Sequence, residues 1–127
     1  MSKIGYVAFD LGAESGRTIL AVFDTDRVEI REISRFENRP LRLPSGDHWD
    51  LFGLWNHLVE GLRLAGQKAR RTSIELVSLG VDTCGVDFGL LGESGQLLGL
   101  PYTYRDPRHQ IGMDQALNKL DKKTIYE

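Results

Sequence analysis

The segment at residues 10–17, with the sequence DLGAESGR, has the residue types of an anion-binding loop. Its two glycines carry no Cβ, so they permit positive φ angles and let backbone amides approach a ligand. Asp10 ends an apolar run, where a carboxylate is suited to a hydrated Mg²⁺, and Arg17 is placed to add a charge-assisted contact to the same anion. The pattern predicts a site for a metal-bound phosphate, and it fits an ordinary acidic hairpin turn about equally well.

This loop differs from two common nucleotide-binding loops. It lacks the Lys-Ser/Thr ending of a Walker loop. The run that follows it, residues 18–23, is β-branched and aromatic, so it predicts a strand, whereas a Rossmann turn is followed by a helix. We therefore expect the loop to join two antiparallel strands.

A second segment whose residue types could do chemistry is GVDTCGVDF at residues 80–88. Asp82 and Asp87 bracket a cysteine and a glycine and are candidates for a paired acid and base, but acidic residues at strand ends are more often turn formers. Cys84 is a candidate nucleophile, but the sequence places no evident base nearby, and we interpret it as a buried structural thiol at a strand end. The residues alone leave Asp82 and Asp87 unassigned.

The elements that position these segments are expected in an α/β order. Short runs at residues 4–9, 18–23 and 28–36 predict a three-strand antiparallel meander. Residues 38–49 hold two prolines and no periodicity, which predicts a loop. An apolar stripe from Leu51 to Ala69 then predicts an amphipathic helix, with Asp50 as its N-cap and cations at its end.

The second half of the chain continues this order. Residues 74–81 form a nearly continuous apolar run, which predicts an interior strand covered on both faces. The turn sequence ESGQ at residues 93–96 predicts a hairpin, and a weak stripe at residues 111–120 predicts a second helix. Together these elements predict a mixed sheet in an α/β domain.

Four side chains that could be functional have simpler interpretations. His48, His57 and His109 lack metal-ligand spacing, so we expect surface or capping roles. Trp55 lies on the helical stripe, which predicts a core position with its indole N–H bonded to a partner.

Composition narrows the class of protein. The 127 residues carry 16 Lys and Arg against 18 Asp and Glu, a net charge of −2, with 41% hydrophobic and 27% charged residues. These values fit one ordinary globular domain and argue against disorder and against nucleic acid as a partner. Cys84 is the single cysteine, the apolar runs fall far short of the roughly 20 residues of a membrane span, and no signal-peptide pattern is evident, so we expect a soluble cytoplasmic protein without a membrane partner.

Three segments, in order along the chain, resemble the FGGY carbohydrate kinases, and within them the rhamnulokinase branch. They are DLGAESGR at residues 10–17, GVDTCGVDF at 80–88 and LPYTYRD at 100–106, and the likeness runs on to Ile125-Tyr126-Glu127. The resemblance implies an actin-like ATPase fold of the ribonuclease H-like type. It also implies that residues 1–127 are the front part of the first lobe, without the rest of that lobe and without the second lobe.

The resemblance further implies roles for individual residues. Asp10 corresponds to the carboxylate near the metal. The expected ATP-binding residues are Ala13, Glu14, Ser15, Gly16 and Arg17, and the expected substrate-binding residues are Gly85, Asp82 and Thr83. The implied ligands are ATP, Mg²⁺ and L-rhamnulose, phosphorylated at its 1-hydroxyl, and the implied partner is the rest of the kinase chain. The catalytic base is expected beyond Glu127, so we expect no catalysis by this chain alone.

Cys84 departs from the resemblance, because the family pattern has tryptophan there. The change leaves one wall of the sugar pocket in doubt, so an FGGY kinase for another ketose or for a polyol stays open. A nucleotide- or sugar-binding module without catalysis is the remaining alternative.

Overall fold

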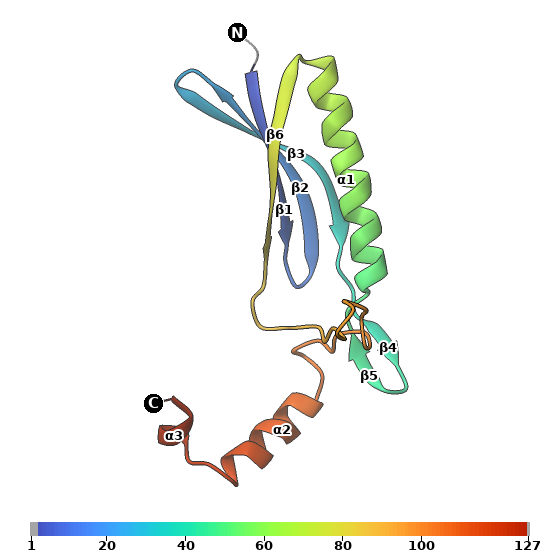
Figure 1. Cartoon of the computed structure of the whole chain (residues 1–127), viewed down its shortest axis with the longest axis vertical. Helices are drawn as coiled ribbons and strands as arrows, with labels where there is room; N and C mark the ends of the chain where they lie inside the picture. Colours follow the sequence, from blue (N-terminus) through green and yellow to red (C-terminus); the bar gives the residue numbers. More distant parts are fainter. Residues whose placement is uncertain (1–2, 127) are drawn as a thin grey trace. The chain divides into compact units, whose positions relative to one another are not determined.

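The computed structural model describes residues 3–126 and divides them into two compact units (Figure 1). The sheet unit comprises residues 3–39 and 50–85, and the loop unit comprises residues 40–49 and 86–126. The elements of the sheet unit are β1 (Lys3–Leu11), β2 (Ser15–Asp24), β3 (Arg27–Glu37), α1 (Leu51–Arg71) and β6 (Ile74–Thr83). Those of the loop unit are β4 (Leu41–Leu43), β5 (Gly46–His48), α2 (Arg108–Leu117) and α3 (Lys122–Tyr126).

The sheet unit is a four-stranded mixed sheet with the strand order β3-β2-β1-β6. β1 pairs antiparallel with β2, and β2 antiparallel with β3, so the predicted meander is confirmed. β6 pairs parallel with β1. Side chains alternate between the faces of a strand, and the buried side chains of β1 and β2 belong to the face that α1 covers.

Helix α1 begins and ends where the sequence predicts. Asp50 Oδ1 accepts a hydrogen bond of 2.9 Å from the Gly53 amide, which confirms the N-cap. The residues that α1 buries are small: Gly61, Ala65 and Ala69. Ala65 packs with Val7 and Phe9, and Ala69 packs with Leu20, Val22 and Ile74. The helix therefore approaches the sheet closely along a stripe of small residues.

The interpretation of Trp55 as a core residue is wrong, because its side chain is 65% exposed. Trp55 lies six positions before Gly61, which places it about 120° around the helix from the face that touches β2. The small residues of α1 fill the contact with the sheet, and Trp55 lies outside it.

The prediction that residues 74–81 form an interior strand is also wrong for this chain. β6 lies at one end of the strand order, and Val77, Leu79 and Val81 are 47%, 53% and 55% exposed. The apolar run correctly indicated a strand, but it carried no information about how many neighbours the strand has here.

The loop unit contains more regular structure at residues 40–49 than the sequence predicted. β4 and β5 form a short antiparallel hairpin there, so the expected loop is wrong. The expected hairpin around residues 93–96 is reduced to a single bridge between Leu91 and Leu97. The predicted second helix is present as α2, and it buries none of its residues. None of the helices within residues 3–126 is both long and apolar enough to cross a membrane.

His48 is buried within the loop unit, at 5% exposure, so a surface role is wrong for this histidine. Its Nδ1 lies 2.9 Å from the Leu100 carbonyl oxygen and must carry the donated proton, since a carbonyl oxygen only accepts. Its Nε2 lies 2.9 Å from Ser45 Oγ, and its ring packs against Tyr102 with a centroid distance of 4.0 Å. His48 therefore links β5 to the segment before α2.

Candidate functional site

The expected phosphate loop is divided between a turn and the start of a strand. The Gly12 amide donates to the Ser15 carbonyl oxygen at 3.0 Å, so the turn is tight and β2 already begins at Ser15. Neither Gly12 nor Gly16 adopts the positive φ that a glycine permits, because the positive-φ residues of the described chain lie elsewhere. Gly16 is needed for close packing instead, since a Cβ there would lie within van der Waals radii of the Phe36 ring.

Asp10 and Arg17 form an ion pair across β1 and β2. They stand directly opposite each other in the register, and Arg17 Nε donates to Asp10 Oδ2 at 3.0 Å. Arg17 Nη2 donates to the same oxygen. The side chains are 34% and 39% exposed for Asp10 and Arg17 respectively, so both groups remain accessible to a ligand. The structure thus brings together the expected metal carboxylate and the expected phosphate cation.

Asn38, directly after β3, holds the turn, and the motif at residues 10–17 does not include it. Its side-chain Nδ2 donates to the Gly12 carbonyl oxygen at 2.8 Å, and its backbone N–H donates to the Glu14 carbonyl oxygen at 2.9 Å. Asn38 is buried, at 8% exposure, so these bonds are shielded from water. The available signal was an asparagine directly after a strand and shortly before Pro40.

Two of the expected substrate residues, Asp82 and Thr83, end β6, and the third, Gly85, follows it. Asp82 pairs with Asp10 and Thr83 with Leu11, because the carboxyl ends of these parallel strands reach the same edge of the sheet. Paired residues share a face, so Asp82 stands beside Asp10 while Thr83 belongs to the opposite face. Gly85 has open space where a Cβ would project, and Cys84 is half-buried, less buried than expected.

The donors available for a metal ion near the turn are carboxylates. Asp10 and Asp82 supply oxygen ligands, which Mg²⁺ prefers, and Mg²⁺ commonly takes one or two carboxylates plus the phosphates of its substrate. Within residues 3–126, no group of three or more His, Cys, Asp and Glu side chains is arranged to hold a metal ion. Asp10 and Asp82 are the two carboxylates at this edge of the sheet that could hold such an ion.

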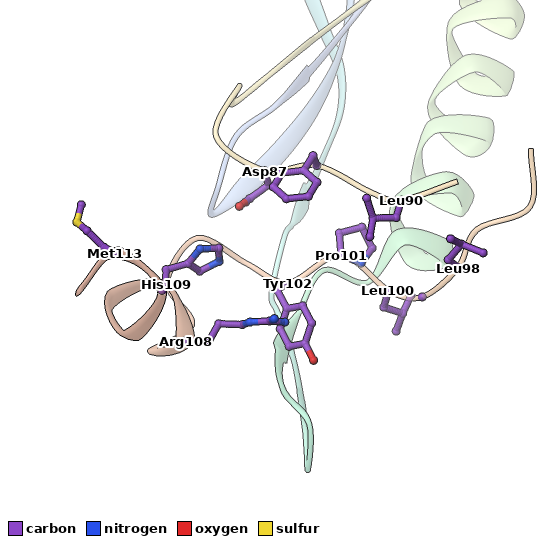
Figure 2. A pocket seen from close by; sticks show the side chains of 12 residues that line it. Asp87, Leu90, Leu98, Leu100, Pro101, Tyr102, Arg108, His109 and Met113 are labelled. Atoms are coloured by element: carbon purple, nitrogen blue, oxygen red, sulfur yellow. The ribbon is translucent and has the colours of Figure 1, made fainter. Parts of the chain in front are cut away.

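A second candidate site is a hollow of about 610 Å³ in the loop unit (Figure 2). Its walls are mainly apolar and include Leu90, Leu98 and Met113. Asp87 contributes a carboxylate that accepts a 2.6 Å hydrogen bond from Trp49 Nε1, so this group already has a partner. Figure 2 shows Arg108 lying across the ring of Tyr102, with Cζ 3.6 Å from the ring centroid.

Two curated relatives match nearly the whole chain. The rhamnulokinase of Bacteroides thetaiotaomicron is 39% identical over 125 residues, which cover 98% of this chain and 25% of that protein. The chain is similar to rhamnulokinases along its length. The rhamnulokinase of Mannheimia succiniciproducens is 38% identical over 128 residues, covering 99% of this chain and 26% of that protein. The resemblance to rhamnulokinases within the FGGY kinases is thereby confirmed, and this chain spans about a quarter of their length. No protein-family model matches the chain.

Solved sugar kinases share the fold. A gluconate kinase from Lactobacillus acidophilus superposes with a TM-score of 0.77 at 13% identity, covering 98% of this chain and 24% of that protein. A xylulose kinase from the same organism superposes with a TM-score of 0.74 at 13% identity, covering 97% of this chain and 24% of that protein. The α/β fold with a mixed sheet is thereby confirmed, and it is consistent with the first lobe of an actin-like ATPase, which the resemblance implied.

Proposed function

We propose that this chain is the front part of the first lobe of an ATP-dependent sugar kinase that phosphorylates L-rhamnulose at its 1-hydroxyl. The observation that carries the proposal is the Asp10–Arg17 pair beside a tight turn, in a chain whose sequence relatives are rhamnulokinases. Phosphoryl transfer depends on positioning and charge stabilisation, and a carboxylate, a cation and a turn are parts suited to that task.

In this proposal the turn and the start of β2 hold the phosphates of ATP. Ala13 and Glu14 belong to the turn, and Ser15, Gly16 and Arg17 begin β2. Arg17 exchanges its bond to Asp10 for a bond to a phosphate oxygen, since guanidinium groups bind phosphate and carboxylate with similar fork geometry. Asn38 keeps the turn closed during this exchange.

Asp10 is the residue to which we assign the metal. Its carboxylate lies at the end of β1, beside Asp82, and the oxygen donors of the two residues fit Mg²⁺. When bound, Mg²⁺ would supply charge neutralisation for the phosphates. Asp10 would hold the metal, and Arg17 would supply a second positive charge to the phosphates.

The sugar is assigned to the end of β6 and the residues just after it, with Gly85, Asp82 and Thr83 as its contacts. The open space at Gly85 supports this assignment, because a hydroxylated substrate can approach the backbone there. Cys84 replaces a larger residue of the family pattern, so a panel of L-rhamnulose, other ketoses and polyols should be compared as substrates. The highest kcat/KM in that panel identifies the sugar.

The proposal also assigns the catalytic base to the rest of the kinase chain, beyond Glu127. Exposed apolar side chains on the edge strand β6, such as Leu79 and Val81, support a further segment packing there. We expect the 127-residue chain to show no transfer from ATP to L-rhamnulose, and measurable transfer would contradict this expectation. We also expect the full-length protein to work in the cytoplasm.

The experiment that tests the proposal replaces Asp10 by Asn in the full-length protein. We expect kcat with ATP and L-rhamnulose to fall by about 100-fold or more, because the variant loses a metal-binding charge. Asp26→Asn, in the turn after β2, removes an equal charge away from the site and should leave kcat unchanged. Unchanged turnover in Asp10→Asn would contradict the role of Asp10. Binding of MgATP or of L-rhamnulose without any transfer by the full-length protein would favour a binding module instead.

A further inference from the structure

Four charged residues stand in register across the sheet, one on each strand. Arg35 on β3 is opposite Arg17 on β2, Arg17 is opposite Asp10 on β1, and Asp10 is beside Asp82 on β6. We call these four residues the charge row. Phe9, the residue before Asp10, packs under α1, so the charge row belongs to the other face of the sheet.

The sign of the charge changes once along the row. The two arginines occupy β3 and β2, and the two carboxylates occupy β1 and β6. Like charges directly opposite each other on neighbouring strands repel, so each arginine needs an anion. Arg17 pairs with Asp10. Arg35 pairs with Glu32, and its Nη2 donates to Glu32 Oε2 at 2.7 Å. A ligand that carries a cation and an anion side by side would match both halves of the row.

Arg35 also reaches the turn itself. Its Nη1 donates to Ser15 Oγ at 3.4 Å, and Ser15 belongs to the segment assigned to ATP. The hydrogen bond to Glu32 raises the pKa of Arg35, and the charge of Asp10 adds to this effect. The side chain of Arg35 is 49% exposed, so it is available to a ligand over β2.

We propose that Arg35 is a second phosphate-binding cation of this site, acting beside Arg17. This inference rests on the proposed nucleotide site and adds a residue from β3 that the loop motif does not include. A nucleotide polyphosphate with its divalent metal would lie along the charge row, with phosphate over the two arginines and the metal toward Asp10 and Asp82. Arg35 would leave Glu32 for the phosphate, as Arg17 leaves Asp10.

The test is the affinity of the full-length protein for MgATP, measured by titration calorimetry for three variants. Arg35→Gln should weaken binding by about 10-fold or more, because a charge-assisted hydrogen bond is lost. Arg35→Lys keeps a point charge without the fork and should lie between Arg35→Gln and the wild type. Arg63→Gln is the matched control. Arg63 pairs with Glu60 at the same i,i+3 spacing and is 52% exposed, but it lies on α1.

Two further readouts separate phosphate binding from a structural role of Arg35. The dependence of MgATP affinity on salt concentration should be weaker in Arg35→Gln than in Arg63→Gln, since one phosphate contact is lost. Affinity for L-rhamnulose alone and the thermal midpoint should be alike in these two variants. Equal MgATP affinity of Arg35→Gln and Arg63→Gln, in a protein whose wild type binds MgATP, overturns this inference alone. A wild type that binds no MgATP overturns the proposed function and this inference with it.

Discussion

Replacing Gly61 by Ala should destabilise the protein, although alanine favours helices. A Cβ at Gly61 would lie 2.0 Å from Thr18 Oγ1, 2.9 Å from Thr18 Cβ and 3.2 Å from Thr18 Cγ2. Nonbonded carbon contacts are normally about 3.5–4.0 Å, so α1 must move away from β2 or Thr18 must move. Thr18 is fully buried, so its side chain cannot move out into solvent.

The expected cost follows from this overlap. Overpacking a closed interior costs about 1–3 kcal/mol, and the helix propensity of alanine returns about 1 kcal/mol at most. Gly66→Ala is the matched control, because its Cβ would meet only Arg70 Nη1, at 3.6 Å. That variant should gain about 0.5–1 kcal/mol from helix propensity alone. Because both variants gain helix propensity, the two should differ in the free energy of unfolding by the overpacking cost alone, about 1–3 kcal/mol.

The assay is urea unfolding of the full-length protein, followed by far-UV circular dichroism. Thr18→Ala supplies a second test in a double-mutant cycle, because it removes the two atoms of Thr18 beyond Cβ. Thr18 Oγ1 has no hydrogen-bond partner within residues 3–126, so its removal breaks no hydrogen bond. We expect Gly61→Ala to cost less in the Thr18→Ala background. Equal stability of Gly61→Ala and Gly66→Ala, or a zero coupling energy, would refute the steric argument.

Two further outcomes can be measured. Asn38→Ala removes the side-chain hydrogen bond to the Gly12 carbonyl oxygen, so the turn should loosen. The Kd for MgATP should then rise by about 5- to 10-fold, while the affinity for L-rhamnulose stays unchanged. An unaltered MgATP affinity would show that the turn holds without Asn38. Backbone amides of Asp47 and Arg108 hold the pKa of Asp106 below its ordinary value of 3.8. The Asp106 carboxylate therefore stabilises the fold at pH values above its unfolded-state pKa, and this stabilisation is lost as the pH falls through its folded-state pKa. Between about pH 7 and pH 3 the thermal midpoint should fall less in Asp106→Asn than in the wild type, and equal falls would contradict this assignment.

Local signals in the sequence determined most of the sheet unit. The short runs at β1, β2 and β3 predicted the meander. Asp50 predicted the start of α1, because N-cap chemistry depends on near neighbours in the chain. The motif at residues 10–17 likewise placed Asp10 and Arg17 near one turn. These features need no knowledge of what lies beyond a few residues.

Only the tertiary structure decided which residues meet from distant parts of the chain. Asn38 and Arg35 join the turn because of the register in which β3 pairs with β2, and no local pattern marks that register. Trp55 is exposed because the contact with the sheet is filled by small residues, and β6 is an edge strand because its second side has no neighbour within the described chain. The sequence alone determined the elements and the chemistry of the motif. Register and packing decided the site, because they depend on distances between residues that are far apart in the sequence.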